Sequence, residues 1–230
     1  MSLNELKLLG QIEDGSQKLG SEQVSITVDE EPRGNYLGMS GLGKDSCTLW
    51  YDYHSPIFNE PVVLGSNKTR IFRLGKIIEE ELIQSITEGG GIVTGRQDKF
   101  IDFDGRLQGH CDGILDYTHV LECKSTSRDF EAYRSGRLQD INPSYYDQIQ
   151  LYMYYSSLGR AMEVFYNKIN SQIAAKEVLF DKTRVNYLRL KAYYILESKH
   201  PFHIPKSFRV DCNSCEWLDI CKDLPTIESL

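Results

Sequence analysis

Hydrophobic residues follow two different spacings along the chain, and these predict a block of strands flanked by helices. Between Arg73 and Ile86 apolar residues recur at helical intervals, and the three glycines at 89–91 end that helix. Other helices are expected over residues 40–54, 143–159 and 183–198. Strands are expected over residues 92–95, 100–103, 107–115, 120–125, 161–167 and 175–180. This order predicts an α/β or α+β domain with a central mixed sheet flanked by helices.

The N-terminal part of the chain gives weaker signals. Residues 11–36 are rich in Gly, Ser, Glu and Asp, and they indicate an arm with one helix before it and an edge strand at 24–28. The stretch 126–141 is polar. No apolar run approaches the roughly 18 residues that span a bilayer, and the first residues lack the basic start and apolar run of a secretory signal. We therefore expect a cytosolic, cytoplasmic protein without a membrane partner.

The composition is that of a folded, acidic protein. Of 230 residues, 40% are hydrophobic and 26% are charged, which excludes a wholly disordered or fibrous chain. The formal net charge of −7 argues against a nucleic-acid partner, because such proteins usually carry a basic surface. That objection concerns the charge of the whole chain, whereas a local site can obtain positive charge from a bound metal ion.

The residues that carry chemistry gather in one predicted hairpin. Side chains alternate along a strand, so Glu122 and Lys124 share one face and Cys123 points to the other. On the preceding strand Asp112 points away from Cys111, so the hairpin would bring Asp112 to Glu122 and Lys124 and leave both cysteines facing away. Buried acids and a lysine are costly unless they bind something. Mg²⁺ prefers oxygen ligands and can lower the pKa of a bound water, which favours a metal site.

The spacing alone leaves a plainer alternative open, a surface hairpin with an ordinary Glu–Lys pair. Two further observations favour the site. Glu79 lies on the apolar flank of its helix, where packing does not require an acid, although a solvated place in the run of glutamates at 79–81 fits equally well. Gln148 and Tyr152 lie one turn apart on the same side of their helix, although taken alone this pair fits an ordinary helix surface better.

Together these residues form an ordered pattern: Gly-x3-acid on a helix, then Asp, then Glu-x-Lys, then Gln-x3-Tyr. The pattern resembles the PD-(D/E)xK nuclease superfamily, and most of all its RecB-like exonuclease branch, over about residues 73–155. In that branch a histidine is common at the position of Glu79, so this chain departs from the commonest form there. The resemblance implies a restriction-endonuclease-like core.

The resemblance also implies a role for each residue of the pattern. It implies that a Mg²⁺ or Mn²⁺ ion is held by Asp112 and Glu122, assisted by the main-chain carbonyl of Cys123, with Glu79 as a direct or an outer-sphere ligand. Lys124 would position or activate the attacking water. Gln148 and Tyr152 would hold the DNA strand near the scissile phosphate.

The cysteines suggest a second metal centre. The chain has six, and the C-terminal three have the spacing C-x2-C-x5-C at Cys212, Cys215 and Cys221. In a reducing cytosol such a cluster indicates metal binding or redox chemistry, and three ligands leave a tetrahedral site one short. Cys111 and Cys123 lie in predicted central strands, whereas Cys47 lies on an exposed-looking helix and is the expected fourth ligand.

An N-terminal cysteine combined with this tail resembles the iron–sulfur nucleases of the same superfamily. These include CRISPR-associated adaptation exonucleases and phage-encoded recombination exonucleases, and residues 36–51 look most like the phage group. The resemblance implies a structural 4Fe–4S cluster, with zinc as the alternative on the same thiolates. We expect residues 1–72 to form an N-terminal arm and helical segment, 73–200 the nuclease core, and 201–230 a cysteine tail packing with the N-terminal segment.

Three basic residues that could bind DNA phosphates follow Glu122 in the sequence: Arg128, Arg134 and Arg137. The tyrosine-rich helix after them could supply aromatic faces on which bases stack. We therefore expect a metal-dependent DNA exonuclease acting on single strands or duplex ends. Its expected context is phage or mobile-element recombination, or else CRISPR spacer acquisition, with a recombination or adaptation protein as partner. The alternatives are a catalytically weak DNA-binding module and a zinc-stapled interaction protein without nuclease activity.

Overall fold

The computed structural model describes residues 1–19, 36–54, 66–205 and 208. Its α-helices are α1 (Leu3–Leu19), α2 (Ser46–His54), α3 (Ser66–Glu88), α4 (Phe130–Ser135), α5 (Leu138–Ile141), α6 (Pro143–Ser156) and α7 (Lys182–Glu197). Its strands are β1 (Leu37–Gly38), β2 (Val93–Thr94), β3 (Lys99–Asp102), β4 (Leu107–His110), β5 (Gly113–Leu115), β6 (His119–Thr126), β7 (Arg160–Asn167) and β8 (Ile173–Leu179). The expected edge strand at 24–28 lies outside the described residues. Within the described ranges, no helix combines the length and the apolar character that crossing a bilayer requires.

Two sheets form the centre of the molecule. The larger has the order β2-β5-β6-β7-β8, in which β6 and β7 run parallel and the other neighbours run antiparallel. The smaller has the order β1-β4-β3, with β1 parallel and β3 antiparallel to β4. The prediction of a central mixed sheet is therefore confirmed.

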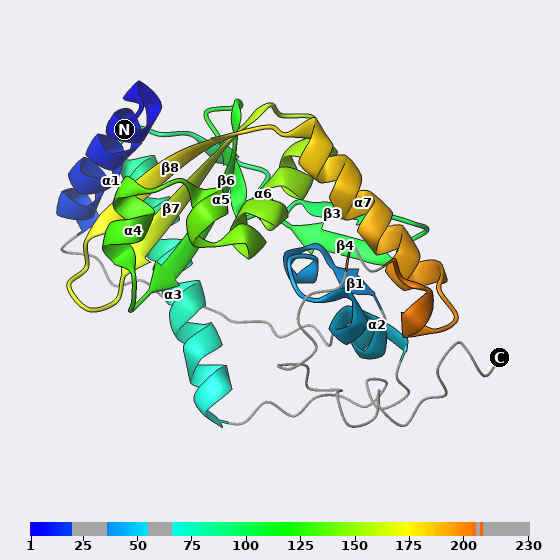
Figure 1. Cartoon of the computed structure of the whole chain (residues 1–230). Coiled ribbons are helices and arrows are strands. Elements are labelled where there is room, and N and C mark those ends of the chain that lie inside the picture. The colour runs from blue at the N-terminus through cyan, green and yellow to red at the C-terminus, as the bar shows by residue number, and fades with distance from the viewer. Residues whose placement is uncertain (20–35, 55–65, 206–207, 209–230) are drawn as a thin grey trace.

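Helices cover both faces of the five-stranded sheet. On one face, residues of α1 and α3 such as Leu8 and Leu82 pack with Leu121 of β6. On the other face, α6 and α7 pack with Val120 of β6, the next residue along the chain. In Figure 1, α4, α5 and α6 lie in front of β6 and β7, and α7 runs down the right-hand side. The alternation of side chains along β6 thus serves two separate cores.

The element boundaries correct several expectations. The expected strand 107–115 is broken at Cys111 and Asp112, so β4 joins the small sheet and β5 the large one. The polar stretch 126–141 folds into α4 and α5 because it carries three apolar side chains that become buried, at Phe130, Tyr133 and Leu138. Leu74 is 45% exposed, so the apolar stripe of α3 begins at Ile78.

Residues 39–54 are fixed to α7 and to the residue that follows it. The Lys191 ammonium of α7 donates to the main-chain carbonyl of Leu42 at 2.7 Å, and the Trp50 indole N–H donates to the carbonyl of Ser198 at 2.7 Å. Cys47 is 4% exposed, so the expectation that its helix exposes it is wrong. These contacts explain why a helix with weak amphipathic character is packed here.

Candidate functional site

Glu122 and Lys124 lie on β6, where the strand turns this face toward α6. Glu122 is buried, and its Oε1 atom accepts hydrogen bonds from the Lys124 ammonium and from the Gln148 amide Nε2, the latter at 2.8 Å. Its Oε2 atom is also buried, and no group in the described part of the chain donates to it. One carboxylate oxygen is therefore fully engaged and the other is left over.

Asp112 reaches this pair from the break between β4 and β5. Its Oδ2 atom accepts the main-chain N–H of Cys123 at 2.7 Å, which ties the break to β6 beside Glu122. The two cysteines are in different places: Cys111 is buried in the core below α6, while Cys123 packs with the core on the α1 and α3 side. Cys123 thus faces away from the site, as expected. For Cys111 the expectation is wrong, because residues 111 and 112 do not lie in a continuous strand.

Glu79 approaches Asp112 from α3. Its Oε1 atom accepts a hydrogen bond from the Gln97 amide at 3.0 Å, and the charge of Asp112 is near enough to disfavour its ionisation. The neighbouring Glu80 instead pairs with Arg96. The structure thus brings Glu79, rather than Glu80, to Asp112.

Gln148 and Tyr152 lie on the buried side of α6. They are 6% and 2% exposed, and the Gln148 amide donates to the Tyr152 hydroxyl at 3.0 Å as well as to Glu122. The alternative of an ordinary helix surface is therefore wrong for this pair. Gly109 of β4 makes room for it, because a Cβ atom at that position would lie 2.7 Å from the Tyr152 ring. Asn142 fixes the start of α6 by accepting the main-chain N–H of Tyr145 at 3.2 Å.

The acids of this site are buried with few groups that stabilise their charged forms, and this raises their pKa values. Burial, reinforced by Asp112, raises the pKa of Glu79 to about 7 and that of Glu122 to about 8. Burial also raises the pKa of Asp112, against the opposing influence of Lys124. Although burial disfavours its charge, the carboxyls of Glu122 and Asp112 raise the pKa of Lys124. Within the site the Lys124 ammonium faces several acids, while Lys76 and Arg96 lower the pKa of Glu79 from outside it. Burial nevertheless outweighs these charges, and the pKa values of the acids stay raised.

One acid of the site was not expected from the sequence. Glu163 of β7 is completely buried and stands in register with Glu122 on the parallel neighbour β6. Burial raises its pKa to about 8. The sequence offers the signal of a lone acid in an otherwise apolar strand, but not the pairing that places this strand beside β6. We call the group Glu79, Asp112, Glu122, Lys124, Gln148 and Glu163 the carboxylate–lysine cluster.

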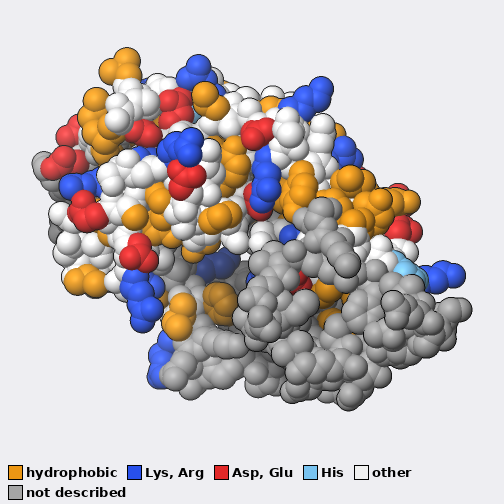
Figure 2. All heavy atoms as spheres, viewed as in Figure 1, with side chains coloured by type: hydrophobic (Ala, Val, Ile, Leu, Met, Phe, Trp, Pro, Cys, Tyr) orange, Lys and Arg blue, Asp and Glu red, His pale blue; other side chains and the backbone are white. Residues whose placement is uncertain are grey.

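The three arginines proposed for DNA are exposed. Arg134 pairs with Glu131 at 2.7 Å, and Arg137 pairs with Asp140 at 2.7 Å, both within their own helical turns. For Arg128, the main-chain N–H donates to the Thr126 hydroxyl at 3.1 Å. Figure 2 shows basic and acidic side chains intermingled over the visible face of the described residues. Positive charge here is thus local and largely balanced.

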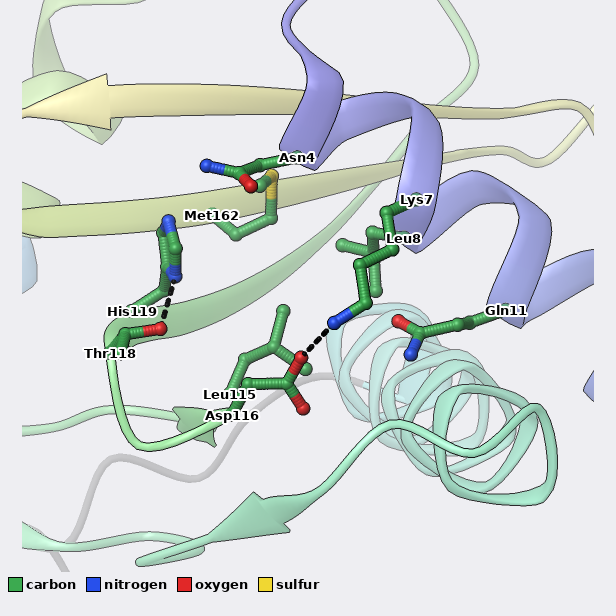
Figure 3. Close-up of a pocket in the computed structure, with 9 residues that line it drawn as sticks. All are labelled: Asn4, Lys7, Leu8, Gln11, Leu115, Asp116, Thr118, His119 and Met162. Carbon is green, nitrogen blue, oxygen red and sulfur yellow. Dashed lines mark hydrogen bonds and ion pairs between the residues drawn. The ribbon is translucent and has the colours of Figure 1, made fainter.

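A second polar cluster lies on the opposite face of the five-stranded sheet. The Glu177 carboxylate of β8 accepts hydrogen bonds from Asn4 at 2.7 Å, Arg160 at 3.0 Å and His119 at 3.2 Å. We call these four residues the Glu177 network. A pocket of about 170 Å³ lies between α1 and the β5–β6 turn, and its lining includes Asn4 and His119 of this network and the ion pair of Lys7 with Asp116. The pocket shown in Figure 3 contains none of the carboxylate–lysine cluster.

The donor chemistry of the carboxylate–lysine cluster can be tested against a divalent cation. The unpartnered, buried Oε2 atom of Glu122 is a hard oxygen ligand of the kind that Mg²⁺ and Mn²⁺ prefer. In the described part of the chain, however, no three His, Cys, Asp or Glu side chains are already gathered around one point. The residues therefore fit a cation chemically, while the Lys124 ammonium occupies the other Glu122 oxygen.

For the cysteines, the structure describes only Cys47 of the proposed four, and Cys212, Cys215 and Cys221 lie outside the described residues. The Ser46 hydroxyl, next to Cys47, donates to the main-chain carbonyl of Phe208. Phe208 in turn packs against the rings of Tyr187 and Tyr194. Phe208, four residues before Cys212, is thus held against the helix that carries Cys47.

No family model matches the sequence, and no curated protein matches it. An alkaline exonuclease (LHK-Exo) from Laribacter hongkongensis is structurally similar, with a TM-score of 0.55 and 16% identity over 70% of this chain and 86% of that chain. The protein SSO0001 is similar with a TM-score of 0.52 and 18% identity, over 98% of this chain and 99% of that chain. A phage-related exonuclease from Haemophilus somnus 129PT is similar with a TM-score of 0.50 and 11% identity, over 70% of this chain and 91% of that chain.

At these identities the likeness concerns the fold alone. It confirms the expected fold class, a mixed α/β core of the restriction-endonuclease-like type. The part of that expectation which concerns the cysteine tail lies outside the described residues.

Proposed function

We propose that this protein is a metal-dependent DNA exonuclease. The observation that carries the proposal is the buried Glu122 carboxylate, which shares one oxygen between Lys124 and Gln148 and leaves the other unpartnered. Such a group is costly to bury unless a ligand completes it. The fold that it occurs in is also that of an alkaline exonuclease and a phage-related exonuclease, which makes a nuclease the class to test first.

In this proposal Asp112, Glu122 and the main-chain carbonyl of Cys123 hold a Mg²⁺ or Mn²⁺ ion, and Glu79 is a further ligand. Bound there, the ion would lower the pKa of a water molecule and stabilise negative charge on a phosphate. Asp112 is already oriented for this by the hydrogen bond from the Cys123 N–H. The proposed carbonyl ligand also belongs to Cys123. A single residue of β6 would therefore both orient Asp112 through its N–H and bind the cation through its carbonyl.

The remaining residues act by orienting. The Lys124 ammonium lies 5.2 Å from the centre of the Tyr145 ring, which restrains it at the edge of the site, and it would hold the attacking water. Gln148 keeps Glu122 and Tyr152 in a fixed relation by donating to both. We propose that this pair, with Arg128, Arg134 and Arg137, holds a DNA single strand or a duplex end near the scissile phosphate.

The decisive experiment is cleavage of end-labelled single- and double-stranded DNA with Mg²⁺ or Mn²⁺. The wild-type protein is compared with Asp112→Asn and Lys124→Ala, and with Glu177→Gln as a matched control on the other face of the sheet. We expect activity in the wild type and the control and its loss in both site variants. Equal cleavage by all four proteins would refute the site. DNA binding without cleavage would favour a weak DNA-binding module instead, and neither binding nor cleavage a zinc-stapled interaction protein.

We also propose that Cys47, Cys212, Cys215 and Cys221 hold a structural 4Fe–4S cluster, with zinc as the alternative on the same thiolates. The contact between Ser46 and Phe208 supports it, because it brings the start of the tail to the helix of Cys47. The purified protein should contain iron and absorb visible light. Cys47→Ser and Cys215→Ser should lose metal to the same extent, whereas Cys111→Ser, in the core, should keep it. Metal content unchanged in Cys47→Ser would exclude Cys47.

The proposed biological setting is phage or mobile-element recombination, with CRISPR spacer acquisition as the other candidate. Each setting supplies a different protein partner, a recombination protein or an adaptation protein.

A further inference from the structure

Glu163 is the least compensated group in the described part of the molecule. It is 0% exposed, and neither of its carboxyl oxygens has a hydrogen-bond partner among the described residues. Glu122 beside it has two donors on one oxygen. Burying a carboxyl group without any partner is unfavourable, so a purely structural role does not explain this side chain.

The strand pairing aims Glu163 into the carboxylate–lysine cluster. Glu163 and Glu122 are register partners on parallel strands, so their side chains project from the same face of the sheet. The neighbours of Glu163 on that face of β7, Ala161 and Phe165, belong to the core below α6. The ring of Tyr133 stacks on Phe165, with 4.2 Å between the ring centroids. Glu163 therefore lies on the same buried face of the sheet as Glu122 and Lys124.

The hydrogen bonds around Glu122 show what Glu163 could do. The Lys124 ammonium now lies on the Oε1 atom of Glu122. If Glu122 becomes a ligand of a divalent cation, its oxygens carry less negative charge toward Lys124, and two positive charges are left next to each other. Lys124 then needs another acid. Glu79 is engaged by Gln97, and Asp112 is itself a proposed ligand, whereas both oxygens of Glu163 are available.

We propose that Glu163 is a positioning residue, which becomes the counter-ion of Lys124 when Glu122 binds a divalent cation. Lys124 would then stay at the site, charged and oriented, instead of being expelled by the cation. This inference rests on the proposed nuclease function, but it makes a separate statement about cation binding. It predicts that Glu163 supports the cation-bound state only through Lys124.

A double-mutant cycle on Mn²⁺ affinity tests this directly. Free Mn²⁺ is measured by electron paramagnetic resonance with four proteins: wild type, Glu163→Gln, Lys124→Met, and the double variant. We expect Glu163→Gln to weaken Mn²⁺ binding roughly tenfold more when Lys124 is present than when it is replaced by Met. Glu177→Gln, which removes an acid from the adjacent strand on the other face, should bind Mn²⁺ like the wild type.

Several results would overturn the inference. An equal loss of affinity in both backgrounds would make Glu163 a ligand of the cation and not a partner of Lys124. Unchanged affinity in both backgrounds would leave it no role at the site. A wild-type protein that binds no Mn²⁺ at all would refute the proposed nuclease centre together with the inference, and that outcome is distinct from the other two.

Folding of the variant is checked in the same samples. Glu163→Gln conserves the shape of the side chain and removes no hydrogen bond within the described chain, so its thermal unfolding midpoint should not fall. Glu163→Leu, of similar volume and without polar atoms, should give the same Mn²⁺ affinity as Glu163→Gln. Different affinities in these two folded variants would contradict a role that depends on the charge of Glu163.

Discussion

Two clusters of charged residues lie on opposite faces of the same five-stranded sheet, and only one of them is complete. In the Glu177 network, the carboxylate on β8 accepts hydrogen bonds from Asn4, Arg160 and His119, and the main-chain N–H of the same residue donates to Glu5 at 2.7 Å. In the carboxylate–lysine cluster, Glu122 leaves one buried oxygen unpartnered and Glu163 leaves two, within the described part of the chain.

The two clusters show that burial by itself does not identify a functional site. Although burial opposes ionisation, the hydrogen bonds from Asn4 and His119 lower the pKa of Glu177 to about 2. Burial without such donors raises the pKa of Glu163 to about 8. The Glu177 network thus joins α1 to the sheet, and it leaves no buried carboxyl oxygen without a partner in the described part of the chain. The carboxylate–lysine cluster is left to be completed by a ligand, which is why we place the function there.

The largest contrast should appear in catalysis. Replacing Glu122 by Gln removes a proposed cation ligand and should reduce Mg²⁺-dependent DNA cleavage by roughly 10²–10³-fold, as losses of key electrostatic groups do. Glu177→Gln makes the same chemical change on the other face and should keep nearly full activity. Initial rates on end-labelled DNA at saturating Mg²⁺ measure both. Similar losses in the two variants would remove the distinction between the clusters.

Mg²⁺ should also stabilise the folded protein, because the cation completes one cluster only. At a Mg²⁺ concentration 100 times the dissociation constant, mass action adds about 2.7 kcal/mol to the free energy of unfolding. Urea unfolding with and without Mg²⁺ measures this gain. It should disappear in Glu122→Gln and persist in Glu177→Gln. A gain that survives in Glu122→Gln would place the cation elsewhere.

Without added metal, the Glu177→Gln variant should lose more stability than the Glu163→Gln variant. Glu177→Gln weakens a satisfied network and should lower the free energy of unfolding by roughly 1–3 kcal/mol. Glu163→Gln breaks no hydrogen bond within the described chain and should not lower it. Urea unfolding of both variants in the presence of a chelator makes the comparison. A lower stability for Glu163→Gln than for Glu177→Gln would contradict the assignment of structural and functional roles.

The order of helices and strands was largely predictable from the sequence, because apolar spacing and terminating residues are local signals. The glycines at 89–91 follow the end of α3, and Pro143 stands at the start of α6, as expected. The break at Asp112 was not predictable from the apolar pattern, because residues on both sides continue as strands and only their pairing separates them. The helices α4 and α5 were missed because three buried apolar side chains stand among polar neighbours.

The sequence predicted those site residues that lie close together in the chain or that belong to the ordered motif. The structure brings Glu122, Lys124 and Gln148 into direct hydrogen bonds, with Asp112 and Glu79 beside them. Glu163 was missed, since its place depends on the parallel pairing of β7 with β6, which is a non-local event. For the same reason Glu177 could not be recognised as the centre of a network that includes Asn4, far away in the sequence.

The pH dependence of stability should show the smallest effect, and it concerns the Glu177 network. The pKa of Glu177 is about 2 in the folded protein, against 4.5 as its ordinary value. A lowered pKa means that the unfolded chain binds the proton more readily than the folded protein does. The stability due to Glu177 is therefore fully present above about pH 4.5 and is lost as the pH falls toward 2. The difference in unfolding free energy between wild type and Glu177→Gln should therefore be constant from pH 7 to 5 and shrink below that. Urea unfolding at a series of pH values down to 3 measures it. A difference that stays constant over the whole series would mean that the Glu177 network is held by the shape of the side chain rather than by its charge.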